Sequence, residues 1–242
     1  MYKPHFSLLL LLFTGLFARG QQPVRLIDDS TLQGGQSYFW HQDTIYLLDG
    51  LVFLEAGGSL RIEAGTVIKG KAQPSTGASS ALVISQGATI EAIGTPRRPI
   101  LFTAEQDDTN NPSDMAPDSR GLWGGLVLLG YGKTNAAGSP NALEGLPAPD
   151  NRALFGGMDD EDNSGALSYV SIRHAGMGLA GLTLAGVGSG AFLNHLEVFS
   201  AQGDGIRLWG GPTARRPHAD ASQSACAASW RSSAALRSTP AA

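Results

Sequence analysis

Cysteine is nearly absent from this chain, and the single Cys226 among 242 residues excludes any disulfide within it. Stability must therefore come from packing and hydrogen bonds. Clear helix start and stop signals are also few, whereas glycine, at 32 residues, is abundant. With frequent Val, Ile, Leu and Thr, this composition predicts an all-β chain with many tight turns.

Long hydrophobic runs are missing as well, since a membrane span needs roughly 20 apolar residues. The run near the N-terminus covers only residues 7–17, follows Lys3 and precedes the small-x-small sequence ARG at 18–20. These three features are typical of a secretory signal peptide at residues 1–20. We expect cleavage before Gln21 and a secreted or cell-surface product that does not span the membrane.

Positive charge is scarce in the central part of the chain. The formal net charge is −4, but residues 1–20 contribute +2 and residues 212–242 contribute +3, so residues 21–211 carry −9. Nucleic acid and anionic lipid both require a basic face on a protein partner. We therefore expect neither as a partner, whereas the acidic body is compatible with cation binding.

Two stretches share one pattern 22 residues apart: LRIEAGTVIKG at 60–70 and LVISQGATIEA at 82–92. Apolar residues alternate within each copy, which is the period of a strand. At ~3.3 Å per residue, 22 residues give a perimeter of roughly 70 Å, which suits a three-sided tube with inward side chains in contact. This overlay predicts that Leu60 stacks on Leu82 in successive turns.

A second pair of stretches has an offset of 26 residues: LSYVSIRHAG at 167–176 and LNHLEVFSAQ at 193–202. Turns of this length carry longer corner loops. Stacked turns whose strands pair in parallel form a parallel β-helix, a single-stranded solenoid in which each turn buries its neighbour. We predict one such domain at 45–211, after a lead-in or cap at 21–44.

The predicted coil is interrupted and then ends. Two polar, proline-containing insertions, at 105–120 and 133–165, are long loops of the kind that often carry binding sites. Residues 212–242 contain no Gly, Val, Ile, Phe or Tyr and cannot supply another turn. We predict a C-terminally incomplete solenoid that stops at Gly211, followed by a disordered or out-of-frame tail, with an Ala-rich helical cap as the alternative.

Five segments carry a family likeness: GTVIKG, GATIEAIGTPRRPILFTA, RGLWGGLVLLG, DNSGALSYVSIRHAG and GLTLAGVGSGAFLNHLEVF. They resemble a family of secreted right-handed β-helix proteins common in Bacteroidota, many of them exported by the type IX system. The similarity spans roughly residues 45–211. It implies a right-handed coil at the cell surface or outer membrane, and it implies no catalytic residues.

The acidic sequence MDDEDNSG suggests a calcium site formed by Asp160, Asp162 and Ser164, because alternate residues of a tight turn point their oxygens to a common centre. An EF-hand is excluded, since its twelfth position would be Ser171 instead of Glu. The alternative is a solvated acidic corner whose side chains cap their own backbone. A second acidic loop at 107–111 could add ligands.

Catalytic residues are harder to find in this sequence. Glycoside hydrolysis needs two carboxylates about 5 Å or about 6.5–9.5 Å apart. Asp204 precedes a strand, with Glu197 and Asp160 as conceivable partners, but no paired acids and no Arg-x-Lys motif accompany it. We therefore read Asp204 as a corner cap and predict no catalytic residue.

Histidine and tryptophan offer two further candidates. The 26-residue overlay places His195 over Tyr169 and keeps it apart from His174, so both histidines are interpreted as lone surface or corner residues. Tryptophan rings can stack on sugars, but the Gly-Gly that follows two of the three indicates packing at corners instead. These three are Trp40, Trp123 and Trp209.

Taken together, these patterns favour a non-catalytic secreted or cell-surface β-helix protein. It would bind carbohydrate, such as an extracellular polysaccharide, or a cell-surface protein through its loops. The alternative is a polysaccharide lyase or glycoside hydrolase built on the same scaffold.

Overall fold

The computed structural model describes residues 22–116, 118–135, 138 and 140–212. The predicted signal peptide and, apart from Pro212, the predicted tail lie outside these residues. In the described part no helix is long and apolar enough to cross a membrane. Its elements are β1 (Val24–Ile27), β2 (Ser37–Trp40), β3 (Ile45–Leu48), β4 (Leu51–Leu54), β5 (Ser59–Ile62), β6 (Val67–Gly70), β7 (Ala81–Ile84), β8 (Thr89–Ile93), β9 (Ile100–Ala104), β10 (Gly125–Leu129), β11 (Asn141–Ala142), the 3-10 helix η1 (Asn151–Ala153), β12 (Leu154–Phe155), β13 (Gly165–Arg173), β14 (Leu182–Ala185), β15 (Phe192–Phe199) and β16 (Ile206–Trp209).

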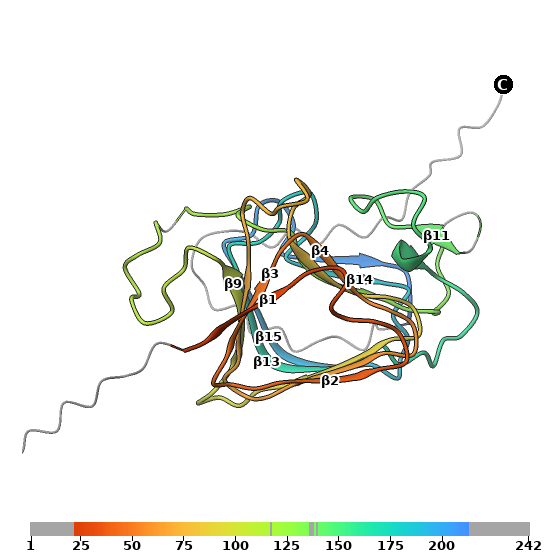
Figure 1. The fold of residues 1–242 in the computed structure, drawn as a ribbon. Coiled ribbons are helices and arrows are strands. Elements are labelled where there is room, and N and C mark those ends of the chain that lie inside the picture. The colour runs from red at the N-terminus through yellow and green to blue at the C-terminus, as the bar shows by residue number, and fades with distance from the viewer. Residues whose placement is uncertain (1–21, 117, 136–137, 139, 213–242) are drawn as a thin grey trace, which may run out of the picture.

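The strands form the three walls of a tube, which Figure 1 shows nearly end-on. All pairs within the walls are parallel, so the fold is a right-handed parallel β-helix, as predicted. Wall 1 consists of β2, β5, β8 and the first halves of β13 and β15. Wall 2 consists of β1, β3, β6, β9 and the second halves of β13 and β15. Wall 3 consists of β4, β7, β10, β14 and β16.

Side chains alternate between the inside and the outside of the tube. In β5, Leu60 and Ile62 are buried whereas Arg61 is exposed. Leu60 pairs with Tyr38 on one side and Ile90 on the other, so apolar residues stack in rows along the tube. Each fully buried side chain of this size stabilises the fold by about 1.5–3 kcal/mol relative to exposure.

The 22-residue overlay correctly indicates the length of a turn but pairs the wrong strands. Leu82 lies in wall 3, where it pairs with Val52 and Leu126, and it does not stack on Leu60 in wall 1. The overlay had matched the corner between β5 and β6 with the corner between β7 and β8. True 22-residue steps join β2 to β5 and β3 to β6. Many corners, including those between β5 and β6 and between β7 and β8, share a strand–glycine–strand pattern, and this hides which wall a strand belongs to.

The 26-residue overlay is confirmed in register. Leu167 pairs with Leu193 and Val170 with Leu196. Both β13 and β15 run through two walls, and each bends at one residue with positive φ, Tyr169 at 49° and His195 at 48°. The strand ladders also begin earlier than residue 45, because β1 and β2 already pair with the coil.

The second insertion, read from the sequence as a polar loop, forms an apolar cover on wall 3. Figure 1 shows β11 and the 3-10 helix outside the tube beside this wall. Leu143, Leu146 and Phe155 join a second hydrophobic cluster on the outer face of wall 3. Wall 3 is therefore buried on both faces, as the fully buried β7, β10 and β14 show. The residues that wall 3 contributes to this second hydrophobic cluster are Phe53, Ala81, Val83, Val127, Leu129 and Ala185.

Arg152 fastens this cover to the start of the coil. Its guanidinium donates two hydrogen bonds to Asp29, both at 3.0 Å, and others to Asp150. Its Cζ atom lies 4.3 Å from the centre of the Phe53 ring. The hydrogen bond from Arg152 lowers the pKa of the Asp150 carboxyl below its ordinary value. These contacts hold the part of the second insertion around Arg152 against wall 3.

Candidate functional site

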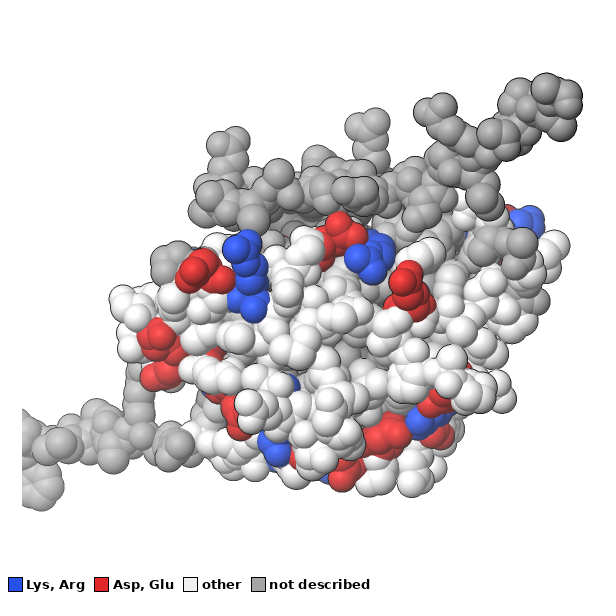
Figure 2. Space-filling view, turned by 90° about the horizontal axis from the view of Figure 1, so that it is seen from above, with Lys and Arg blue, Asp and Glu red and all other residues white. Residues whose placement is uncertain are grey.

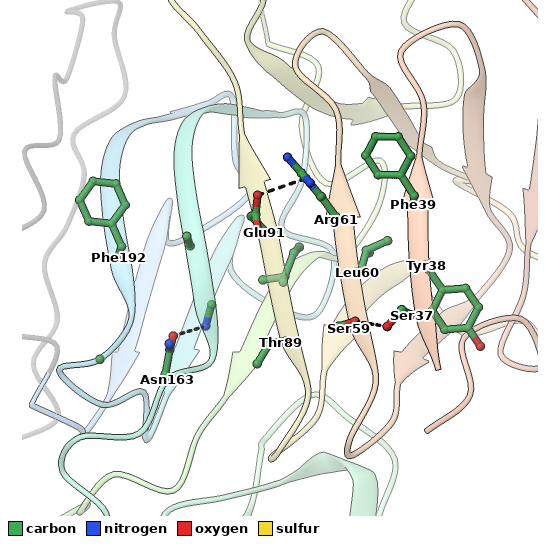
Figure 3. Close-up of a pocket in the computed structure, with 14 residues that line it drawn as sticks. Ser37, Tyr38, Phe39, Ser59, Leu60, Arg61, Thr89, Glu91, Asn163 and Phe192 are labelled. Carbon is green, nitrogen blue, oxygen red and sulfur yellow. Dashed lines mark hydrogen bonds and ion pairs between the residues drawn. The ribbon is translucent and has the colours of Figure 1, made fainter. Parts of the chain in front are cut away.

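A groove of about 670 Å³ lies on the outer face of wall 1. Figure 3 shows it crossing β2, β5, β8, β13 and β15, which means that it runs along the axis of the tube. The insertions contribute to it only Asn163 and Gly165, at the end of the second. The lining residues are Ser37, Tyr38, Phe39, Ser59, Leu60, Arg61, Thr89, Ile90, Glu91, Asn163, Gly165, Ala166, Gly190 and Phe192.

One row of outward side chains runs the length of the groove. Parallel register aligns the five residues of this row, because each pairs with the next on the neighbouring strand. Two phenylalanines stand at its two ends, 44% and 53% exposed. Figure 3 shows the ion pair of the row between these rings. In order along the tube, the row is Phe39, Arg61, Glu91, Ala166 and Phe192.

A second row beside the first carries hydroxyl groups. Ser37 pairs with Ser59, and Ser59 pairs with Thr89. Ser59 Oγ donates to Ser37 Oγ at 2.9 Å. Short side chains at these positions keep the floor of the groove low and place donors and acceptors along it.

The charges that line the groove balance each other. Arg61 Nε lies 3.2 Å from Glu91 Oε1, and the Arg61 Cζ atom lies 5.8 Å from the centre of the Phe39 ring. Arg61 and Glu91 are the only charged residues among those that line it. The groove therefore presents two exposed aromatic faces, hydroxyls and a neutralised ion pair to a ligand.

The proposed calcium ligands lie at the corner that leads into wall 1, and their side chains have hydrogen-bond partners within the protein. Lys133 Nζ donates to Asp160 Oδ2 at 3.0 Å, and this bond lowers the pKa of Asp160. Asp162 Oδ2 instead accepts a hydrogen bond from Ser164 Oγ at 3.0 Å. Residues 22–116, 118–135, 138 and 140–212 contain no group of three His, Cys, Asp or Glu side chains suited to a metal.

Calcium at this corner would have to displace Lys133, and melting curves test it. A ligand that binds only the native state stabilises it by mass action, by about 2.7 kcal/mol at 100 times its dissociation constant. The calcium hypothesis predicts a higher Tm with Ca²⁺ and no such rise in a variant with both Asp160→Asn and Asp162→Asn. Lys133→Met, which removes the competing ammonium group, should enlarge the rise. Equal Tm values with Ca²⁺ and with chelator in the unaltered protein would contradict the hypothesis.

The three acids considered for catalysis lie apart. Asp160 contacts Lys133 in the second insertion, Glu197 lies on the outer face of wall 2, and Asp204 accepts a hydrogen bond from Arg207 at the corner before β16. Glu197 accepts a hydrogen bond from Ser171 Oγ on the neighbouring strand. The structure does not bring them together as a pair of catalytic carboxylates.

A second cavity, of about 400 Å³, lies between the first insertion and wall 2. It brings Arg173, His174 and Glu197 together with Asp107, Asp108 and Asp114. His174 is a corner residue, one of the two kinds of position expected from the sequence, and it is buried, with only 4% of the residue exposed. Its Nδ1 lies 2.6 Å from the Ser119 carbonyl oxygen, which fits an N–H donor.

The remaining ring residues behave mostly as the sequence predicts. His195 stacks on Tyr169, with ring centroids 4.1 Å apart. Trp40 and Trp123 are buried core residues, and Trp209 packs at the edge of the second cluster. The exposed rings of the groove, Phe39 and Phe192, were missed. The one available signal was their outward position in the strand alternation, which depends on knowing the register.

Comparison with known proteins agrees with this architecture. The model of a family described as a pectate-lyase-like β-helix domain matches residues 33–216, well over half of the chain. No curated protein and no solved structure gave a significant match. With three walls of parallel strands over the same residues, the chain belongs to the pectate-lyase-like β-helix family.

Proposed function

We propose that this protein is a non-catalytic secreted or cell-surface module that binds carbohydrate in the groove on wall 1. The observation that carries the proposal is the row with exposed Phe39 and Phe192 at its two ends. A flat aromatic ring suits the apolar face of a pyranose, and the hydroxyl row supplies partners for sugar hydroxyls. Export through the signal peptide at 1–20, and the finer likeness to type IX-exported proteins of Bacteroidota, are parts of this proposal.

The charge distribution supports a carbohydrate over nucleic acid. Figure 2 shows acidic side chains interspersed with basic ones, and no broad basic patch on the described residues of that face. Residues 21–211 carry a formal charge of −9. A polyanionic partner would be repelled by such a surface.

Glycan-array binding tests the proposal directly. We expect the protein to bind a subset of glycans, and a variant with both Phe39→Ala and Phe192→Ala to lose about tenfold or more in affinity, because each ring contributes about 0.5–1.5 kcal/mol. Met158→Ala is the control, since Met158 is exposed and does not line the groove. A double variant that binds as tightly as the unaltered protein would place the glycan site elsewhere.

The cavity on wall 2 favours a lyase or hydrolase as the second candidate. It holds a carboxylate, an imidazole and a guanidinium within one cavity: Glu197, His174 and Arg173. The proposed function predicts no release of reducing sugars or unsaturated products above background from polysaccharides. Turnover that Glu197→Gln abolishes would replace it with this second candidate.

A further inference from the structure

The axis of the groove sets the length and shape of a ligand that fills it. Its main row crosses five strands, from β2 to β15. Neighbouring strands lie about 4.8 Å apart, so the two rings at its ends are separated by roughly 19 Å. A sugar chain that follows the row must be linear and extended, because a bent or branched chain would leave it after one or two strands.

The repeat of the wall also suits a chain of similar repeat. A hexose joined through positions on opposite sides of its ring advances by a distance comparable to one strand spacing, which is about 4.8 Å. Five such units, with four steps from the first centre to the last, span the distance from Phe39 to Phe192. Each inner unit then lies over one member of the hydroxyl row or over the small Ala166.

The neutral lining decides the charge of the ligand. A uronate carboxylate would need an unpaired cation, but Arg61, the only cation among the described residues that line the groove, already pairs with Glu91. Removing Arg61 from this pair would leave the Glu91 carboxylate to repel the uronate. The acidic body of the protein adds to this repulsion.

Resting on the proposed function, we infer that the groove binds a neutral, linear glycan laid along the tube axis, about five hexose units at a time. Phe39 and Phe192 stack on the terminal units of this stretch. The ion pair of Arg61 and Glu91 hydrogen-bonds to hydroxyl groups in between and excludes acidic sugars.

Titration with neutral linear oligosaccharides of increasing length tests the geometry. We expect affinity to rise to about the pentasaccharide and then to level off, with little dependence on salt. Phe39→Ala and Phe192→Ala should each weaken binding of the pentasaccharide by up to about tenfold. Together they should weaken it by the product of the two factors, because one ligand contacts both rings. Affinity that is already maximal at the disaccharide would overturn the axial arrangement.

A Glu91→Gln variant tests the charge selection. Without the carboxylate, Arg61 becomes available to an anion, so we expect polyuronates to bind the variant at least about tenfold more tightly than the unaltered protein, with affinity that falls as salt rises. Glu91→Asp, which keeps the charge, is the matched control. Tight uronate binding by the unaltered protein that Arg61→Gln abolishes would overturn the inference and leave carbohydrate binding intact. Failure to bind any glycan would overturn both.

Discussion

Gly165→Ala is expected to lower the free energy of unfolding by about 4 kcal/mol or more and the Tm by roughly 10 °C, or to prevent folding. Gly165 begins β13 with φ at 123°, a backbone conformation that L-residues rarely adopt. A Cβ atom there would lie 1.9 Å from Ile90 O and 2.6 Å from Ile90 N on the neighbouring strand. Backbone atoms cannot rotate away as a side chain can, so the ladder between β8 and β13 would have to open.

Gly77→Ala is the matched control for this substitution. Gly77 also has positive φ, at 75°, but nothing lies within 4 Å of the added Cβ. Its cost should be the conformational strain alone, about 1–2 kcal/mol. Urea unfolding of both variants measures the difference. Equal losses in the free energy of unfolding would show that the backbone around Ile90 moves to relieve the contact with the added Cβ. Gly165 would then be needed only for the acidic turn before it.

Trp123→Ala should destabilise the protein by about 3–5 kcal/mol, as expected for a large buried aromatic side chain. The Trp123 ring is fully buried in the tube and packs against Gly70. Its Nε1 donates to the Arg173 carbonyl oxygen at 2.8 Å, a bond that ties the corner before β10 to the end of β13. Trp123→Phe keeps most of the packing and should lower the free energy of unfolding by less. Its loss relative to the unaltered protein then reports mainly the missing hydrogen bond.

Trp209→Ala supplies a comparison with the same local sequence, because both tryptophans occur in the motif LWGG. Trp209 is only half-buried and lies 6.3 Å from the Phe155 ring, measured between centroids. We expect Trp209→Ala to lower the free energy of unfolding, measured in urea, by less than about half as much as Trp123→Ala does. A larger loss at Trp209 would mean that the cover on wall 3 contributes more stability than the tube.

Much of the architecture was available from local pattern. Alternation of apolar residues in LRI and a short apolar run in LVI both indicate strands, and the glycines between strands indicate corners. The 26-residue overlay succeeded because β13 and β15 are long and each carries one distinctive corner residue, Tyr169 and His195. A match over seven paired positions leaves no other register.

Register failed where the strands are short. Four-residue strands such as β5 and β7 both carry large apolar residues at their second and fourth positions, so the sequence cannot tell a neighbour one turn away from a neighbour one wall away. The assignment of a strand to a wall depends on the summed lengths of the intervening loops. The step from β2 to β5 is 22 residues, but the step from β5 to β8 is 30.

The candidate groove depends on this same register. Strand periodicity in the chain was enough to predict a parallel β-helix, because alternation and glycine spacing are local properties of the backbone. The meeting of Phe39 and Phe192 in one row was not predictable, since 153 residues separate them and every intervening loop contributes to the alignment. Nor did polar composition reveal that the second insertion covers wall 3, because its few apolar anchors, Leu143, Leu146 and Phe155, acquire a common face only when the chain folds back onto the tube.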